Sequence, residues 1–253
     1  MAHSEIEQLR ALVGDLPYPE GVMVDRQNEI VGPAFFPGGS GMLKDTGMIS
    51  DKPIMILGHD QDNEKGFNRT IRGDKKLTPP RGETYSFTWR QLQKSLAESG
   101  IEETDCFFTN FIMGIRKNAP SNTGTSPALK EARFVEKCAA LLIRQIDLQK
   151  PEAILCLGIV PLRLLSLISH NVHYRYVAVD SFNEIHERGA EMVIDDITEL
   201  PGFKTKLIVV AHPSSKRRKE STKSKGQKER DSTEIDMLRC LVSDLRAKRS
   251  VVA

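Results

Sequence analysis

The sequence lacks an apolar run near the roughly 18 residues that a membrane-spanning helix needs, so we expect no membrane segment. The first ten residues, MAHSEIEQLR, include no apolar stretch typical of a secretion signal, so we expect a cytoplasmic protein. Cysteine is scarce, and its four residues form no C-x-x-C pair, which argues against a zinc site or an iron–sulfur cluster. We therefore expect no metal and no cofactor. Three of the four cysteines lie in apolar segments, as buried free thiols of a reducing cytosol do.

The chain has 253 residues, of which 39% are hydrophobic and 28% charged, so it can form a sizeable core. This length suits one large domain or two small ones. Since no internal repeat or linker is visible, we expect a single domain spanning residues 1–253. Within it, residues 1–50 read as an N-terminal helix followed by an irregular extension rich in glycine and proline.

Short apolar runs alternate with segments of helical spacing. The runs predict strands at 53–57, 106–112, 153–157, 174–179 and 207–211. The helical segments are 4–13, 87–98, 128–149, 160–169 and a last helix capped by Asp231 or Ser232, while 59–84 and 117–127 read as loops. Ser4 and Glu7 predict a capping box on the first helix. The alternation predicts an α/β fold, a three-layer α/β/α sandwich with a mainly parallel central sheet.

Positive charge is concentrated in one polar segment. Residues 216–230 hold eight Lys/Arg and two Glu, whereas the rest of the chain carries a net charge of −4. Without apolar periodicity this segment predicts a solvated loop, here called the basic segment. A charge run of this kind either improves solubility or contacts phosphates.

Polar residues follow three of the predicted strands. The first strand leads into Gly58-His59-Asp60, the second carries Asn110 near its end, and the last leads into His212-Pro213-Ser214. Alone, each has an ordinary structural role as a turn former, a backbone partner or a loop histidine. Because the carboxyl ends of parallel strands meet at one edge of a sheet, we expect them to converge there.

This combination resembles the uracil-DNA glycosylase superfamily. That family has a first-strand motif of the form G-Q-D-P-Y-H, an asparagine on the second strand, and a final-strand H-P-S before a DNA-contacting loop. Gly58-His59-Asp60 matches half of the first motif, Asn110 matches the asparagine, and His212-Pro213-Ser214 matches the last motif fully. The similarity covers about residues 50–245.

The resemblance implies a monofunctional glycosylase that hydrolyses an N-glycosidic bond and leaves an abasic site. Asp60 would be the anion near C1′ that also holds a water, and His212, neutral, would donate to the pyrimidine O2. Asn110 would read the edge of the base, in a pocket lined also by Gly58, His59 and Asp62. The flipped base would stack on Phe67, with Tyr85 or Phe87 as alternatives and a plain core role for Phe67 left open.

The same resemblance implies DNA, as duplex or single strand, as the partner of a monomer that associates with the nucleoid when acting. Phosphates would be held near Gly158 and Ser214 and by the start of the basic segment, which extends over about 215–231: Lys216, Arg217, Arg218 and Lys219. The position of this segment directly after H-P-S favours DNA contact over solubility alone.

The sequence also departs from the family pattern. Gln61-Asp62-Asn63 replaces P-Y-H, so Asp62 stands where the family's tyrosine excludes thymine at C5. We therefore leave two substrates open, uracil and a cytosine with a hydroxymethyl or glucosyl group at C5, as in some phage DNA, which would make the protein an anti-phage enzyme. Lys216 to Arg218 stand where the family has an intercalating leucine, and Ile159 replaces its phosphate-binding serine.

Two other functions remain as alternatives. The first is a catalytically silent nucleic-acid-binding module of the same fold, against which the presence of both Asp60 and His212 argues. The second is a phosphate-binding hydrolase that uses the glycine-rich segment 37–41. That segment lacks the lysine pattern of a P-loop, and a tight turn is the interpretation we prefer.

Overall fold

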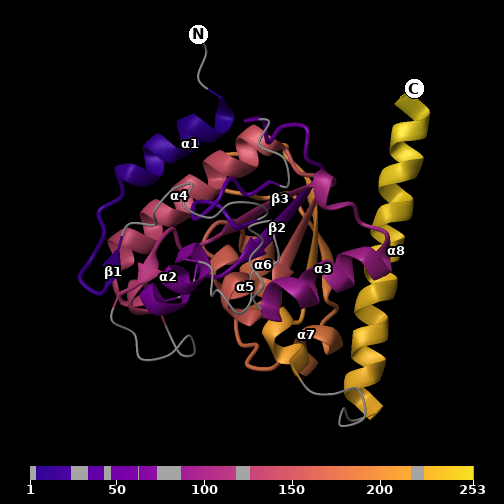
Figure 1. The fold of residues 1–253 in the computed structure, drawn as a ribbon. Helices are drawn as coiled ribbons and strands as arrows, with labels where there is room; N and C mark the ends of the chain where they lie inside the picture. Colours follow the sequence, from indigo (N-terminus) through magenta and orange to yellow (C-terminus); the bar gives the residue numbers. More distant parts are fainter. Residues whose placement is uncertain are drawn as a thin grey trace.

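The computed structural model describes residues 4–23, 34–42, 47–61, 63–72, 87–117, 126–217 and 225–252. Its centre is a five-stranded sheet with strand order β3-β2-β5-β7-β6 (Figure 1). Four of its strands are parallel and β6 is antiparallel to β7. The strands are β2 (Ile54–Gly58), β3 (Cys106–Asn110), β5 (Ala153–Leu157), β6 (Glu191–Ile194) and β7 (Thr205–Val210). The predicted α/β sandwich with a mainly parallel sheet is confirmed.

Alternating side chains of the strands face two separate cores. On one face Met55, Phe107 and Ile154 pack against α1 (Glu5–Gly14), α4 (Ala132–Gln149), α5 (Ile159–Leu165), α6 (His170–Tyr176) and α7 (Phe182–Glu187). On the other face Ile56 and Phe108 pack against α3 (Phe87–Ser99) and α8 (Lys225–Val252), which lie together at the right of Figure 1. Both faces are therefore covered, which explains why the strands are nearly continuous apolar runs.

Several predicted features hold in detail. Ser4 Oγ accepts from the Glu7 amide at 3.3 Å, and Glu7 Oε2 accepts from the Ser4 amide at 2.9 Å, so the capping box of α1 is confirmed. Three cysteines are buried free thiols, and Cys240 is exposed on α8. The helix predicted at 128–149 is divided into the short 3-10 helix η2 (Pro127–Lys130) and α4.

The strand predicted at 174–179 is wrong, because this segment belongs to α6 and the turn after it. Ser169 caps α6 by accepting from the Val172 amide at 3.2 Å, and Asp196 accepts from the Asn171 amide at 2.7 Å. Tyr174 is 89% exposed, so the apolar letters of this segment do not form one buried face. The outer strand is β6 instead.

The segment 59–84 is not all loop, because it contains α2 (Glu64–Arg72), at whose start Asn63 Oδ1 accepts from the Gly66 amide at 2.7 Å. The last helix begins at Lys225 rather than at Asp231 or Ser232, so the end of the basic segment is helical. The 3-10 helix η3 (Pro213–Arg217) carries the Pro-Ser part of the H-P-S motif, and residues 218–224 lie outside the described part. A further short 3-10 helix, η1 (Glu103–Asp105), precedes β3.

A two-stranded ribbon lies beside the main sheet and was not predicted. It pairs β1 (Val22–Met23) with β4 (Ile115–Arg116) in antiparallel register, Val22 opposite Arg116. β4 follows β3 after four residues, so it lies near the carboxyl end of that strand. The ribbon thereby brings Arg116 to the edge of the sheet where the sequence predicts the site.

The glycine-rich segment 37–41 forms a tight turn against β3. The Gly39 amide donates to Phe35 O at 3.1 Å and the Gly41 amide to Ala34 O at 3.0 Å. Gly41 has φ of 73°, and a Cβ there would lie 2.6 Å from Phe108 O, so only glycine suits this close approach. Because these two amides are used within the turn, the segment does not form a phosphate cradle around them.

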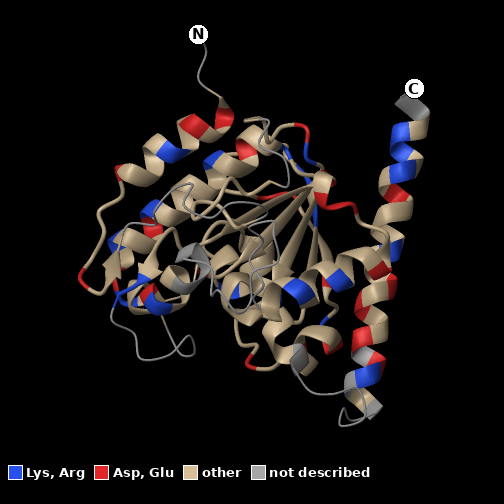
Figure 2. Cartoon of the chain, in the orientation of Figure 1, with Lys and Arg blue, Asp and Glu red and all other residues tan. Residues whose placement is uncertain are grey.

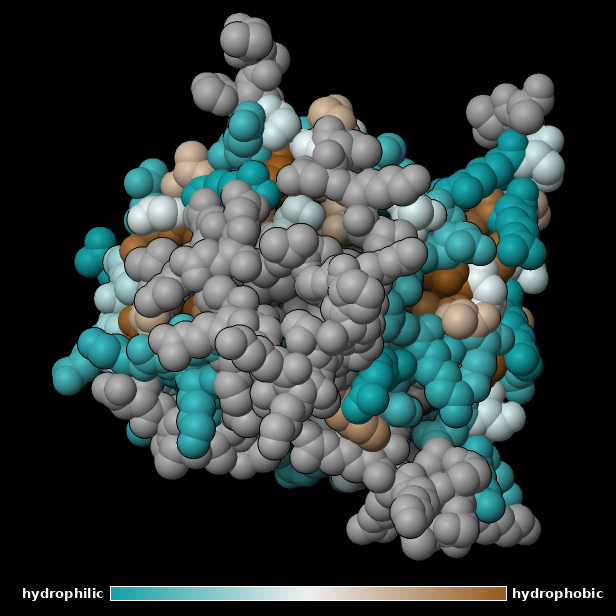
Figure 3. All heavy atoms as spheres, in the orientation of Figure 1, coloured by the Kyte–Doolittle hydropathy of each residue, from teal (hydrophilic) through white to brown (hydrophobic). Residues whose placement is uncertain are grey.

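Charge is distributed along the helices rather than gathered on one of them. Lys/Arg and Asp/Glu alternate along α8 (Figure 2), and the side chains over α3 and α8 are mostly hydrophilic on the face in Figure 3. Among the helices that the structure describes, none combines the length and the apolar character needed to cross a membrane.

Candidate active site

The predicted residues meet at the carboxyl edge of the sheet. Gly58 and Asn110 are register partners at the ends of β2 and β3. Leu157 and Val210 pair at the ends of β5 and β7, and His212 follows two residues later. A Cβ on Gly158 would lie 3.2 Å from the His212 Cβ, so the ends of β5 and β7 are in contact there. The convergence predicted from the three strand ends is therefore present.

Asp60 is held by a buried arginine. Arg116 Nε donates to Asp60 Oδ2 at 2.6 Å and Arg116 Nη2 donates to Asp60 Oδ1 at 3.0 Å, a bidentate pair. The two side chains are only 6% and 7% exposed. The sequence predicts Asp60 as an anion near C1′ that also holds a water, and it does not identify Arg116 as its partner. The sequence does contain a signal for Arg116, because this charged residue directly follows the apolar run 111–115.

His212 is fixed in one tautomer by Ser214. The Ser214 amide donates to His212 Nδ1 at 3.2 Å, and Ser214 Oγ lies 2.7 Å from the same nitrogen. A backbone amide can only donate, so Nδ1 is the acceptor and the ring proton is on Nε2. Burial, followed by the nearby His59, lowers the pKa of His212 below 6.5. His212 is therefore a neutral imidazole with an N–H at Nε2.

His59 lies beside this pair. Its Nδ1 is 3.8 Å from Asp60 Oδ1, and its Nε2 is shielded from water with no hydrogen-bond partner among the described residues. Burial and the charge of Arg116 lower the pKa of His59, against the opposing effect of Asp60. A second neutral imidazole thus lies beside Asp60, at the motif position where the family has glutamine.

Asn110 is 3% exposed and is bound to Gln61, which was not selected from the sequence. The Asn110 Nδ2 donates to Gln61 Oε1 at 3.2 Å. A Cβ on Gly58 would lie 2.4 Å from Asn110 Oδ1, so glycine leaves room for the amide. The same position would lie 3.2 Å from the ring of Phe35, which therefore lies next to Gly58.

The aromatic candidates have different surroundings. Phe67 is buried on α2 and packs with Ala34, Met23 and Ile115, so it has the core role that was left open for it. Its ring edge also lies against Gly38, next to Gln61. Phe87 is the first residue of α3, and Tyr85 and Asp62 lie outside the described residues. Stacking of a base on any of these rings stays a prediction.

The residues predicted to bind phosphate are only partly described. The Gly158 amide donates to Val210 O at 2.8 Å and is therefore used within the fold. Ser214 binds His212 through its amide. Lys216 and Arg217 belong to η3, whereas Arg218 and Lys219 lie outside the described residues. Contact between the basic segment and DNA stays a prediction.

A buried glutamate lies behind the H-P-S motif. Glu234 of α8 is 1% exposed, and its Oε1 accepts from the Ala211 amide at 2.8 Å, one residue before His212. His186 Nε2 lies 3.9 Å from the same oxygen. Glu234 has helical spacing with Leu238, which could have indicated a glutamate on the buried stripe of the helix.

Among the described residues, no group of three His, Cys, Asp or Glu side chains is arranged to hold a metal ion. A comparison with curated proteins found no match. A comparison with protein families matches the uracil DNA glycosylase superfamily over residues 46–234, a range that includes every site residue predicted from the sequence. The chain therefore belongs to the uracil-DNA glycosylase superfamily.

Proposed function

We propose that this protein is a monofunctional DNA glycosylase that releases a pyrimidine from a flipped nucleotide by hydrolysis. The family acts on DNA, and its members are generally glycosylases. The observation that carries the proposal is the neutral His212 beside Asp60 at the carboxyl edge of the sheet, with the proton of His212 at Nε2. Such a group can donate to an oxygen that becomes negative as the base leaves.

The reaction breaks the bond between C1′ and N1 of the base, and the electron pair stays with the base. Negative charge collects on the pyrimidine O2, where the His212 N–H would donate a hydrogen bond. Positive charge collects on the sugar, near the Asp60 carboxylate. Water then adds its oxygen to C1′, and its proton neutralises the departing base. The products are the free base and an abasic site.

The ion pair with Arg116 limits what Asp60 can do. A carboxylate has about four acceptor positions, and the bidentate arginine uses two of them. The remaining positions can accept a hydrogen bond from the attacking water. Yet a carboxylate neutralised by arginine stabilises a nearby cation less, and this favours the second candidate, a catalytically silent DNA-binding module of the same fold.

Two substrates remain within the proposal, uracil and a C5-modified cytosine of phage DNA, the second implying an anti-phage role. The modified base is supported by Asp62 in the place of a bulky tyrosine, since a small polar residue leaves C5 accessible. DNA binding by a monomer is supported by the basic segment, which follows the H-P-S motif directly. We place this activity in the cytoplasm, at the nucleoid.

The test is base release from DNAs that contain uracil, a thymine mispair, 5-hydroxymethylcytosine or glucosylated cytosine, with abasic sites detected by alkaline cleavage. Asp60→Asn, which also removes the counter-ion of Arg116, and His212→Asn should each lower release by about 10²–10⁴-fold and leave DNA binding largely intact at temperatures where circular dichroism shows the variants to be folded. Asp105→Asn and His173→Asn, away from this edge, are the matched controls. Binding without release from any DNA would establish the silent module instead.

The basic segment is tested by salt dependence. Replacing Lys216, Arg217, Arg218 and Lys219 by glutamine should weaken binding to all sequences alike. The slope of log affinity against log salt should flatten by about one for each phosphate that the variant no longer binds. An unchanged slope would assign the segment to solubility.

A further inference from the structure

The asparagine that would read the base in the proposed site has a side-chain partner, Gln61. Gln61 is the fourth residue of the first motif, where the family pattern has proline, a side chain without a hydrogen-bonding group. In this chain Gln61 Oε1 accepts from Asn110 Nδ2 at 3.2 Å. The contact joins residues from two strand ends that are 49 positions apart.

Gln61 is itself held in place. A Cβ on Gly38 would lie 2.8 Å from Gln61 Cδ and 2.9 Å from its Nε2, so the amide lies directly against the turn 37–41. The same Cβ would lie 3.1 Å from the ring of Phe67, which borders the amide on this side. The absence of a side chain at Gly38 therefore makes room for Gln61 beside Asn110.

The orientation of an asparagine amide decides which base it can read. Uracil presents a donor at N3 and an acceptor at O4, whereas cytosine presents an acceptor at N3 and a donor at its amino group. An amide turned by 180° exchanges its own donor and acceptor and so changes from one pattern to the other. In the structure the acceptor beside Nδ2 is Gln61 Oε1, which favours one of the two orientations.

We propose that Gln61 is a specificity-determining residue, which selects between uracil and cytosine-type bases by fixing the amide orientation of Asn110. This inference rests on the proposed function, because it assumes that Asn110 contacts the base. Gln61→Glu keeps an acceptor for Asn110 Nδ2, whereas Gln61→Met fills similar space without one. Gly38→Ala displaces the Gln61 amide without removing any hydrogen-bond donor or acceptor from the chain.

The experiment measures binding to two single-stranded DNAs that differ only in one nucleotide, 2′-fluorodeoxyuridine or 2′-fluorodeoxycytidine, so that no base pair has to be opened. The fluorine disfavours positive charge on the sugar, so these nucleotides report base recognition without cleavage. The wild type should prefer one DNA by about tenfold or more, since a mismatched amide leaves polar groups unpaired. Gln61→Glu should keep that ratio within about twofold. Gln61→Met and Gly38→Ala should bring it close to one.

Gln93→Met is the matched control, because Gln93 Nε2 makes one partly buried bond to Glu103 at 3.1 Å, near the amino end of β3. It should leave the ratio unchanged. The proposed role of Gln61 would be wrong if Gln61→Met kept the wild-type binding ratio. It would also be wrong if Gln61→Glu lost that ratio as fully as Gln61→Met does. Equal binding of both DNAs by the wild type would remove it too. Wild-type binding of neither DNA above an unmodified single strand, together with no base release from any of the four DNAs of the release assay, would instead remove the proposed function.

Discussion

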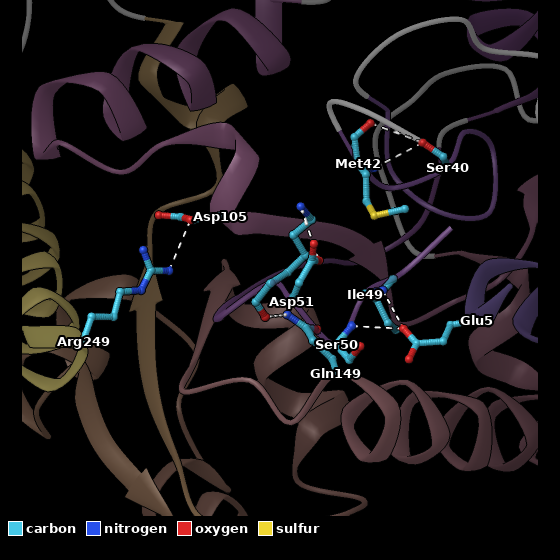
Figure 4. Close-up of polar contacts among 10 residues, drawn as sticks. Glu5, Ser40, Met42, Ile49, Ser50, Asp51, Asp105, Gln149 and Arg249 are labelled. Carbon is cyan, nitrogen blue, oxygen red and sulfur yellow. Dashed lines mark hydrogen bonds and ion pairs between the residues drawn. The ribbon is translucent and has the colours of Figure 1, made fainter. Parts of the chain in front are cut away.

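The two ends of the central sheet use charged side chains in opposite ways. At the amino end, Arg249 pairs with Asp105 at 3.2 Å with side chains 55% and 34% exposed (Figure 4). At the carboxyl end, Arg116 pairs with Asp60 in a site that is less than a tenth exposed. Exposed pairs form at little cost, whereas a buried pair must offset the loss of hydration of both ions. Fold stability alone therefore explains the amino end but not the carboxyl end.

The polar contacts outside these ion pairs show a related difference. At the amino end, polar side chains bind backbone groups: Glu5 Oε2 accepts from the Ile49 and Ser50 amides, and Gln149 Nε2 donates to Lys52 O (Figure 4). At the carboxyl end, Glu234 and His212 also bind backbone amides, but Asn110 in addition binds the side chain of Gln61. A side chain that binds a backbone group satisfies the hydrogen bonding of the main chain. A bond between two side chains fixes the position of one functional group relative to the other. This arrangement is what a reacting or base-reading site requires.

The largest effect should come from breaking the buried pair. Arg116→Leu leaves the Asp60 carboxylate buried without its counter-ion, and should lower the free energy of unfolding by about 3–5 kcal/mol in urea titrations. The double variant Asp60→Leu, Arg116→Leu removes both charges and should recover most of that loss while releasing no base. If Arg116→Leu and the double variant were equally stable, the unpaired Asp60 carboxylate would not be costly. The pair would then be hydrated despite its low exposure.

A smaller effect should come from the support behind His212. Glu234→Leu removes the acceptor of the Ala211 amide and should lower the free energy of unfolding by about 1.5–3 kcal/mol. By displacing His212 it should also lower kcat about tenfold with KM nearly unchanged, a split that stability alone does not produce. Glu234→Gln keeps an oxygen acceptor and should restore most of kcat. Asp236→Ala, exposed on the same helix, is the control.

Much of this arrangement was predictable from the sequence, because it depends on local pattern. The apolar runs located β2, β5 and β7, and the polar residues after β2 and β7 located the edge where the site lies. Arg116, Gln61 and Glu234 were not predicted, because each acts on a partner between 23 and 56 positions away in the chain. The local sequence pattern around a residue does not indicate a contact with a residue so far away in the chain.

The errors in the predicted secondary structure have identifiable causes as well. The segment 174–179 has apolar and β-branched residues, yet it is helical up to Tyr176 because Ser169 and Asp196 satisfy the first amides of α6. The polar composition of α2 predicts a loop, although Asn63 begins this helix in the manner of an N-cap. In both segments the capping contacts favour a helix, although the amino-acid composition does not predict one.

The pH dependence of stability should report the two histidines of the carboxyl end. The pKa values of His59 and His212 are lowered in the fold, so the unfolded chain takes up protons first as the pH falls below 6.5. Their contribution to the free energy of unfolding is complete above pH 6.5 and is lost between that value and the lowered pKa values. In urea titrations at pH 7.5 and 5.5, the double variant His59→Gln, His212→Asn should lose less stability than the wild type. His173→Asn, exposed on α6, should lose as much as the wild type.

The smallest effect should come from the exposed pairs of the amino end. Lys248 binds Glu152 at 2.8 Å, with the lysine side chain 66% exposed, and Arg249 pairs with Asp105 one residue further along α8. Lys248→Ala and Arg249→Ala should each change the free energy of unfolding by less than about 1 kcal/mol, and less still in high salt. Base release should stay at the wild-type rate, since the helix is held by Leu238, Leu241 and Leu245 on its buried face. A loss as large as that of Arg116→Leu would show that both ends of the sheet depend on their ion pairs for stability, and the burial of Asp60 would then need no functional explanation.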